Sequence, residues 1–210
     1  MTGTEHTEQT EQPERPTRRE QQAEQRRAQL IDTALDLFAE KGVESTTIKD
    51  IATHADVAQG LVYHYFDSKD ALFMAVIERH GPIKPARELM TQVYGHPASE
   101  KLPEIAHAMY RLASEREKLL RIVLREALTR PEMRQVLLLV RGQMLAIVGG
   151  YLQSRIAAGE LRPHATDVTL QTMALSILSL VLLGLPPDPY IDDLVETVLH
   201  GISAEPAHQE

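Results

Sequence analysis

The sequence contains no cysteine and no tryptophan, and its only aromatic residues are three Phe and six Tyr. The absence of cysteine excludes disulfides, thiolate metal sites and a cysteine nucleophile. The N-terminus lacks the apolar segment of a signal peptide. The longest apolar run, MALSILSLVLLGL from Met173, is shorter than the ~20 residues that a membrane-spanning helix needs. We therefore expect a cytoplasmic protein with no membrane partner.

The chain also lacks positive charge. Its formal net charge is −8 over 210 residues, which taken alone argues against a nucleic-acid partner. A hydrophobic content of 43% is ordinary for a globular protein with one or two domains. Net charge is a blunt criterion, however, because a basic face can coexist with an acidic back.

The sequence shows no sustained period-2 alternation, so we expect an all-α protein. In a first helix starting at Arg18, Leu30, Ala34 and Phe38 recur at helical spacing, and Gly42 is a typical stop. Proline and glycine then separate further helical segments. These are expected at 85–94, 100–116, 118–129, 132–158, 167–184 and 188–202.

Two short helices follow the first one. Thr47 is a good N-cap with Asp50 three residues later, close to a capping box. The next turn needs a residue at positive φ, for which Asp56 is the candidate. A second short helix is expected at 59–66, and either Asp67 or Ser68 caps the helix after it. This is a helix-turn-helix arrangement, whose second helix lies in the major groove of DNA.

The few aromatic residues gather in this region. Tyr63, Tyr65 and Phe66 lie within four consecutive positions. A tyrosine ring can pack on a neighbour while its hydroxyl reaches a phosphate, and Phe66 can pack beneath the helix. Lys69 is expected in the first turn of the next helix, where a cation opposes the helix dipole. Its position makes sense if Lys69 and free N–H groups meet a phosphate together.

At this point the stretch ALDLFAEKGVESTTIKDIATHADVAQGLVYHYFDSKDAL resembles the N-terminal domain of the TetR family of bacterial transcriptional regulators. The resemblance covers roughly a quarter of the chain closely, over residues 26–73. It implies a helix-turn-helix DNA-binding domain at 18–80, a larger helical ligand-binding and dimerisation domain at 81–203, and a tail at 204–210. Residues 1–17 hold almost no apolar side chain, so we expect a disordered tail there.

The resemblance also implies which residues contact DNA. Phosphate contacts are expected from Thr47, Lys49, Tyr63, Tyr65 and Lys69. Base contacts are expected from Gln59, Gly60, Leu61 and His64. Tyr65 can instead be pure packing, and Lys49 a solvated charge. Two departures from the family pattern, Asp56 in the turn and Ala58 before the recognition helix, make the DNA face less positive and remove a helix cap.

For the C-terminal part, the resemblance implies a homodimer and an effector pocket. The dimer is expected through the helices near 167–184 and 188–202, as a four-helix bundle. If Arg141 is buried it needs an anionic partner, either Glu126 or a ligand; at the surface it carries no such meaning. Met at helical spacing is also the pattern of plain core. The expected pocket lining is Met109, Tyr110, Val123, Arg141, Met144, Val148, Tyr151 and Met173.

An enzyme is the first rival interpretation. The histidines have no metal-ligand spacing, His107 and His164 lack obvious partners, and the serines show no nucleophile elbow. We therefore expect no catalytic residue, metal or cofactor. The favoured function is a repressor that binds a palindromic operator as a homodimer and is released by a small hydrophobic effector. The alternatives are an activator, or a small-molecule-binding helical protein whose DNA site is weakened or lost.

Overall fold

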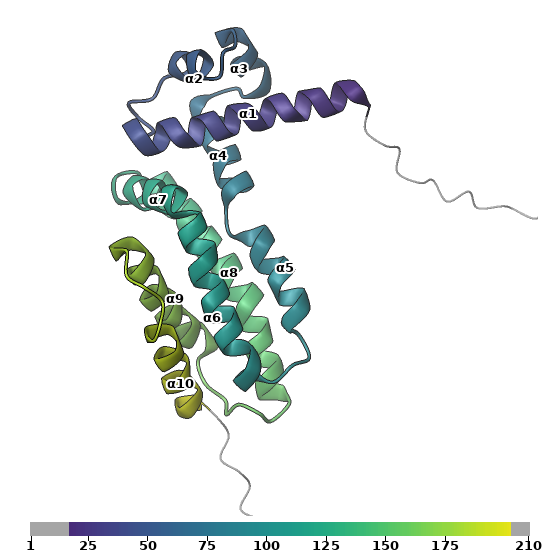
Figure 1. Cartoon of the computed structure of the whole chain (residues 1–210), viewed down its shortest axis with the longest axis vertical. Coiled ribbons are helices and arrows are strands. Elements are labelled where there is room, and N and C mark those ends of the chain that lie inside the picture. The colour runs from purple at the N-terminus through teal and green to yellow at the C-terminus, as the bar shows by residue number, and fades with distance from the viewer. Residues whose placement is uncertain (1–16, 203–210) are drawn as a thin grey trace, which may run out of the picture.

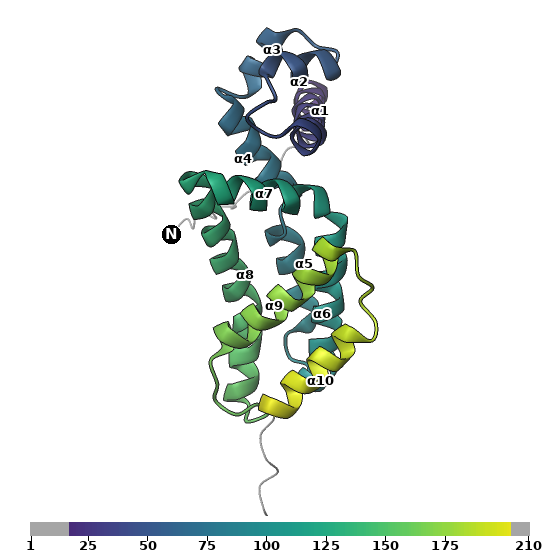
Figure 2. The ribbon, with the colours of Figure 1, turned by 90° about the vertical axis from the view of Figure 1, so that its left-hand side faces the viewer.

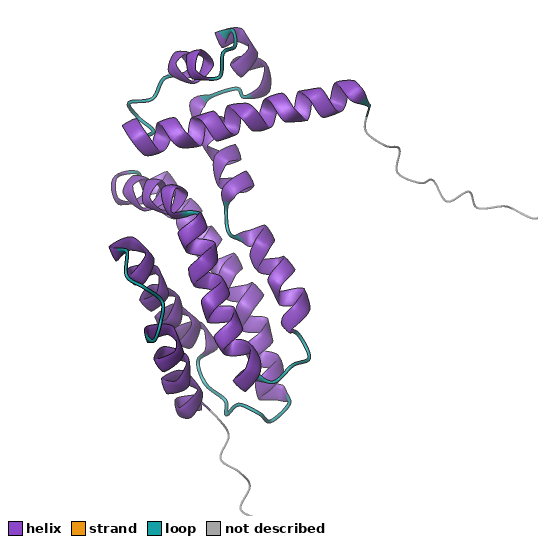
Figure 3. Cartoon of the chain, in the orientation of Figure 1, coloured by secondary structure: helices purple, strands orange, loops and turns teal. Residues whose placement is uncertain are grey.

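The computed structural model describes residues 17–202, which form ten helices and no strand (Figure 3). The all-α prediction is confirmed. In chain order the helices are α1 (Arg18–Lys41), α2 (Ile48–His54), α3 (Gln59–Tyr65), α4 (Lys69–His80), α5 (Ile83–Val93), α6 (Ala98–Glu115), α7 (Glu117–Thr129), α8 (Pro131–Ala157), α9 (Thr166–Leu183) and α10 (Tyr190–Ile202).

The first helix begins and ends at local signals. Thr17 caps α1 through a capping box with Glu20, so Thr17 belongs to the helix start and not to the predicted tail. The remainder of that tail and residues 203–210 lie outside the described residues. At the other end, Gly42 has φ 90° and donates its N–H to the carbonyl of Phe38.

The predicted signals of the helix-turn-helix are also present. The Thr47 hydroxyl accepts from the Asp50 N–H at 3.1 Å, and an Asp50 carboxylate oxygen accepts from the Thr47 N–H at 2.9 Å. Asp56 has φ 53°, the left-handed conformation expected in the turn. Ser68, rather than Asp67, caps α4 by accepting from Ala71 at 3.0 Å.

The C-terminal helices lie within two residues of the predicted bounds. Helices α5 and α6 each begin two residues earlier than predicted. α5 begins at Ile83, so Pro85 lies in its first turn, where the missing N–H would have no helical partner anyway. α6 begins at Ala98 and carries Pro103 inside it.

The first hydrophobic core lies under the helix-turn-helix. Phe38 of α1 and Phe73 of α4 are fully buried, with ring centroids 5.4 Å apart in an edge-on arrangement. Leu119 and Ile122 of α7 and Met133 of α8 belong to the same core. Although α4 ends at the predicted domain boundary, helices from the C-terminal part therefore complete the core of the N-terminal part.

The second core fills the space between α5, α6, α8, α9 and α10, at the opposite end of the molecule (Figures 1 and 2). Tyr151 is its largest fully buried side chain. The Tyr151 hydroxyl donates to the carbonyl of His96 at 3.0 Å. Burial raises the pKa of Tyr151 to about 12.

Helix α7 joins the two ends of the molecule. Lys118 pairs with Asp36 of α1 at 2.9 Å, and the Arg125 guanidinium donates to the carbonyl of Phe38 at 3.0 Å. Arg130, which follows α7, pairs with Asp70 in the first turn of α4 at 3.0 Å. That hydrogen bond raises the pKa of Arg130.

Helices α8 and α9 are each long and apolar enough to span a bilayer by length and composition alone, which is weak evidence for a membrane segment. Both contribute to the second core, through Tyr151 and Leu152 of α8 and through Met173 and Ile177 of α9. Core helices of globular proteins share this composition.

Candidate nucleic-acid interface

Helix α3 presents one polar face to solvent. Gln59, Gly60, Tyr63 and His64 are exposed, at the i, i+1, i+4 and i+5 spacing of one helix face. Val62 is fully buried on the opposite face. Three of the four predicted base contacts therefore share an accessible surface. Leu61, the fourth, is half-buried beside it.

Contacts from α1 hold both ends of α3. Before the helix, Gln29 donates its side-chain N–H to the carbonyl of Ala55 at 3.0 Å. After the helix, the Arg27 guanidinium lies over the Phe66 ring, 5.2 Å from its centroid. Ala58 itself makes no side-chain cap. The position of α3 therefore depends on α1 rather than on a local helix cap.

The two tyrosines of α3 differ in their surroundings. Tyr63 is 50% exposed, with its ring on the face shared with Gln59 and His64. Tyr65 is half-buried against the first core, and its ring contacts His64 edge-on at 5.1 Å between centroids. Tyr63 is thus available to a phosphate, whereas the contacts of Tyr65 are those of a packing residue.

Lys69 has a structural task that the sequence did not reveal. Its ammonium donates to the carbonyls of Glu44 and Thr46, at 2.9 and 3.0 Å, and so ties α4 to the loop between α1 and α2. The Ser68 hydroxyl takes one of the first N–H groups of α4. A bound phosphate is therefore not needed to explain a cation at this position, and that argument is corrected. One of the three ammonium protons of Lys69 remains available for a phosphate.

Thr47 and Lys49 flank the start of α2. The Thr47 hydroxyl donates to Asp50 at 2.7 Å, and hydrogen bonds from the Thr47 side chain and backbone lower the pKa of the Asp50 carboxyl. A phosphate contact from the hydroxyl proton would compete with this bond. Lys49 is exposed.

Thr46 is a positioning residue that was not singled out for the site. It is fully buried, and its hydroxyl bonds to the carbonyls of Gly42, at 2.7 Å, and Leu37. Its carbonyl accepts from Lys69. The sequence signal for this role was the pair Thr46 and Thr47 before α2, because only Thr47 is needed as the helix cap.

The structure does not bring the predicted pocket residues to one place. Val148, Tyr151 and Met173 are buried in the second core, and Met109 and Tyr110 pack against it. Val123 packs against the first core, and Met144 is half-buried.

Arg141 is exposed and bonds to Gln171. Its suggested partner Glu126 is only 5% exposed and lies 3.7 Å from both Arg125 and Arg130. Arg141 is thus at the surface, and the conditional argument for a buried anion partner does not apply to it.

A shallow groove of about 280 Å³ lies between α5 and α8. Its apolar residues Met90, Tyr94 and Ile147 lie beside Arg87. The Tyr94 hydroxyl occupies the space that a Cβ at position 150 would fill, at 2.6 Å, so Gly150 permits this approach. None of the predicted pocket residues lines this groove.

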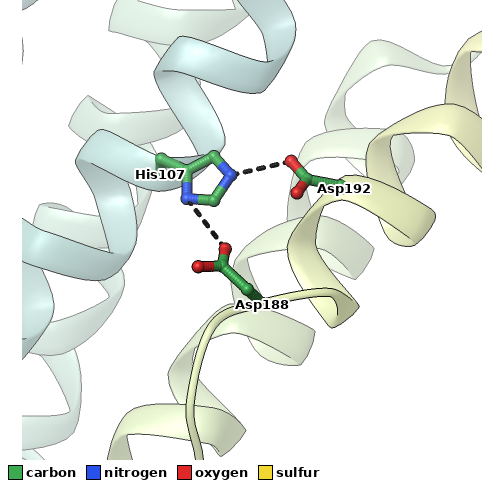
Figure 4. A group of neighbouring side chains, drawn as sticks. All are labelled: His107, Asp188 and Asp192. Carbon is green, nitrogen blue, oxygen red and sulfur yellow. Dashed lines mark hydrogen bonds and ion pairs between the residues drawn. The ribbon is translucent and has the colours of Figure 1, made fainter.

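His107 does have partners, contrary to the sequence interpretation. Figure 4 shows its ring between two carboxylates, with Asp192 at 2.8 Å from Nε2 and Asp188 at 3.9 Å from Nδ1. The three groups are close enough to share a metal ion. The two carboxylates lie at opposite ring nitrogens, however, and the hydrogen bond from Nε2 to Asp192 ties α6 to α10. His164 bonds through Nδ1 to the carbonyl of Arg162.

Comparison with known proteins places the N-terminal geometry in context. Residues 30–76 match the family model for bacterial regulatory proteins of the tetR family. The transcriptional repressor KstR2 of Rhodococcus jostii is 49% identical over 47 residues, which are 22% of this chain and 23% of that protein. The chain thus spans less than a third of the length of the curated relatives it matches.

Solved structures extend the likeness to the whole fold. A regulatory protein of the tetR family from Rhodococcus superposes with a TM-score of 0.68 at 17% identity, over 86% of this chain and 98% of that one. The ketosteroid transcriptional regulator KstR2 of Mycobacterium tuberculosis gives 0.57 at 21% identity, over 86% and 96%. At these identities the likeness concerns the fold alone.

Proposed function

We propose that the chain is a cytoplasmic, dimeric transcriptional repressor of the TetR family that reads a palindromic operator, a proposal supported by the match of residues 30–76 to the model for bacterial regulatory proteins of that family. The observation that carries the proposal is the exposed polar face of α3, with Gln59, Tyr63 and His64 on a helix held at both ends by α1. Gln suits adenine, and Tyr63 suits a phosphate. The relatives matched over this segment include transcriptional repressors.

A dimer follows from what one recognition helix can read. A single helix covers few base pairs, whereas two helices about 34–36 Å apart read successive major grooves. We place the dimer face on α8 and α9, where Leu138, Leu139, Val168, Leu175 and Leu183 are exposed. This keeps α9 from the sequence prediction and replaces α10 by α8.

The reason for replacing α10 is the character of its exposed face. Its exposed residues include Asp193, Glu196 and Thr197, and Tyr190 at its start is the one large apolar side chain that is exposed on this helix. Leu175→Glu should therefore convert a dimer to a monomer in light scattering, while Glu196→Leu leaves the mass unchanged. A dimer that survives Leu175→Glu would contradict the α8–α9 face.

Effector control is proposed through α7. A small hydrophobic ligand bound among α5 to α8 would shift α8, against which α7 packs. Helix α7 holds α1 through Asp36 and holds the start of α4 through Asp70. Such a shift would change the separation of the two recognition helices and lower operator affinity. Operator affinity that is unchanged at saturating effector would contradict this mechanism.

The experiment that tests the proposal is selection of duplexes from a random DNA pool at physiological salt, followed by titration of the enriched duplex. We expect one palindrome to be enriched, and Tyr63→Ala to weaken its binding. Tyr190→Ala is the matched control, since Tyr190 is similarly exposed but lies on α10. If no sequence is enriched and Tyr63→Ala binds duplexes like the wild type, the chain is better described as a small-molecule-binding protein with a lost DNA site.

A further inference from the structure

The first turns of α1 form a helical extension that packs against no other part of the described chain. Residues 17–26 are exposed, and the first buried residue of α1 is Leu30. At 1.5 Å per residue, Arg19 lies about 16 Å along the helix from Leu30. Figure 1 shows this purple segment projecting beyond α2 and α3.

The sequence favours a helix in this extension although it lies apart from the two cores of residues 17–202. Its residues 18–26, RREQQAEQR, are all good helix formers. The capping box of Thr17 and Glu20 satisfies the first N–H groups, and hydrogen bonds to Thr17 lower the pKa of the Glu20 carboxyl. A free helix of this length would be marginal, so continuity with the packed part of α1 must hold it.

The extension is positive in an acidic protein. Residues 17–26 carry three arginines and two glutamates, whereas the whole chain has a net charge of −8. Within residues 17–202, Arg18 and Arg19 are exposed and neither guanidinium has a hydrogen bond or an ion pair. Unpaired arginines on a rigid, uncovered helix are the groups that a polyanion binds.

The base of the extension adjoins the proposed DNA surface. Arg26 donates to Gln29 at 2.7 Å, and Gln29 in turn bonds to Ala55 in the turn before α3. Arg27 lies over Phe66, directly after α3. The turn of α1 at the base of the extension therefore contacts the segments that precede and follow α3.

We propose that Arg18 and Arg19 bind backbone phosphates beside the groove that α3 reads, so that α1 adds a second, sequence-independent DNA contact. The proposal rests on the proposed function. It also accounts for how a domain with an acidic balance binds DNA when Ala58 and Gln59 supply no cation to the groove. Phosphate contacts position a protein on the duplex, while base contacts supply the specificity.

The salt dependence of operator binding tests the proposal. A dimer carries two copies of Arg19, so Arg19→Ala removes two phosphate contacts and lowers the slope of log K against log[salt] by about 1.8. With equal affinities at 1 M salt, this difference in slope makes Arg19→Ala bind the operator about 30-fold more weakly than the wild type at about 0.15 M salt. The titration uses the full-length protein and the palindrome enriched from the random pool.

Three controls separate a phosphate contact from other effects. Arg19→Lys keeps the charge and should keep the slope, whereas Arg111→Ala removes an exposed arginine from α6 and should change nothing. Gln59→Ala should alter the enriched sequence, whereas Arg19→Ala should not. Circular dichroism shows whether each variant keeps its helices.

Two results would overturn the inference while leaving the proposed function intact. One is a wild-type slope for Arg19→Ala on an operator that the wild type binds. The other is an equal loss in Arg19→Lys and Arg19→Ala, since a contact made by charge survives that exchange. If the wild type enriches no duplex, the proposed function fails first and the inference fails with it.

Discussion

The helices of the two halves begin in different ways. In the N-terminal half, the side chains of Thr17, Thr47 and Ser68 cap α1, α2 and α4. In the C-terminal half, the starts of α5 to α9 have no side-chain cap. The N-terminal helices are thus specified by near neighbours in the sequence, whereas the C-terminal helices depend on length and on the apolar face that each one buries.

The recognition helix is the exception in its half. Ala58 precedes α3 without a side-chain hydrogen bond, and the helix has only seven residues. It is held instead by Val62 in the core and by Gln29 and Arg27 from α1. A helix held by tertiary contacts can keep its outer face polar and exposed.

The first prediction, which has the largest expected effect, tests whether the two halves of the molecule unfold as one cooperative unit. Phe38→Ala removes a fully buried ring and should lower the free energy of unfolding by about 3–5 kcal/mol. Because Leu119 and Ile122 of α7 belong to the same core, we expect one cooperative transition in urea, monitored by circular dichroism.

Met173→Ala in the second core is the matched variant for this test, with an expected loss of about 2–5 kcal/mol. It should shift the same single transition. Two separate transitions, each moved by only one of these variants, would show that the halves unfold independently.

The second prediction concerns pH and the C-terminal core. The pKa of Tyr151 is about 12 in the folded protein, against an ordinary value near 10. Between these values the unfolded chain has lost the proton that the native chain keeps, so stability falls as pH rises from about 10 to 12. At about 1.4 kcal/mol per pKa unit, the loss is about 2–3 kcal/mol over the whole range, and about half of it is reached at pH 11.

Tyr151→Phe should remove this component of the alkaline loss. At neutral pH the variant should be less stable by about 1 kcal/mol, because the carbonyl of His96 loses its donor. Urea titrations of both proteins at pH 7, 10 and 11 measure these effects. An unchanged alkaline loss in Tyr151→Phe would assign it to other groups.

The third prediction sharpens the difference in helix starts. Thr47→Ala removes a capping box and should cost about 1 kcal/mol. Ala58→Ser supplies the missing cap of α3 and should add about 1 kcal/mol. Thermal unfolding of both variants measures the two shifts, which should have opposite signs. A destabilised Ala58→Ser variant would mean that the contacts from α1 leave no room for a cap.

The smallest expected effect concerns Gly60. A Cβ at this position would meet nothing within 4 Å, so the fold gives no reason for glycine there. Gly60→Ala should therefore stabilise α3 by up to about 1 kcal/mol. It should also weaken operator binding, because the added methyl stands where the groove approaches. Gly201→Ala, equally open but on α10, is the control and should leave operator binding unchanged.

Much of the fold could be predicted because its signals are local. The capping boxes, the positive φ of Asp56 and the stop at Gly42 each involve residues within a few positions of one another. The exposed face of α3 also follows from helical spacing around the buried Val62. The surroundings of Lys69 and the partner of His107 were beyond such signals.

The sequence by itself determined the helical segments, the capped starts of α1, α2 and α4, the stop at Gly42 and the polar face that α3 presents, because these depend on hydrogen bonds and periodicities within about four residues. Tertiary structure alone decided that Lys69 ties α4 to the carbonyls of Glu44 and Thr46, that His107 meets Asp192, and that α7 completes the first core. These contacts join residues 23 to 85 positions apart. No local pattern encodes such distances, because they arise only when whole helices pack.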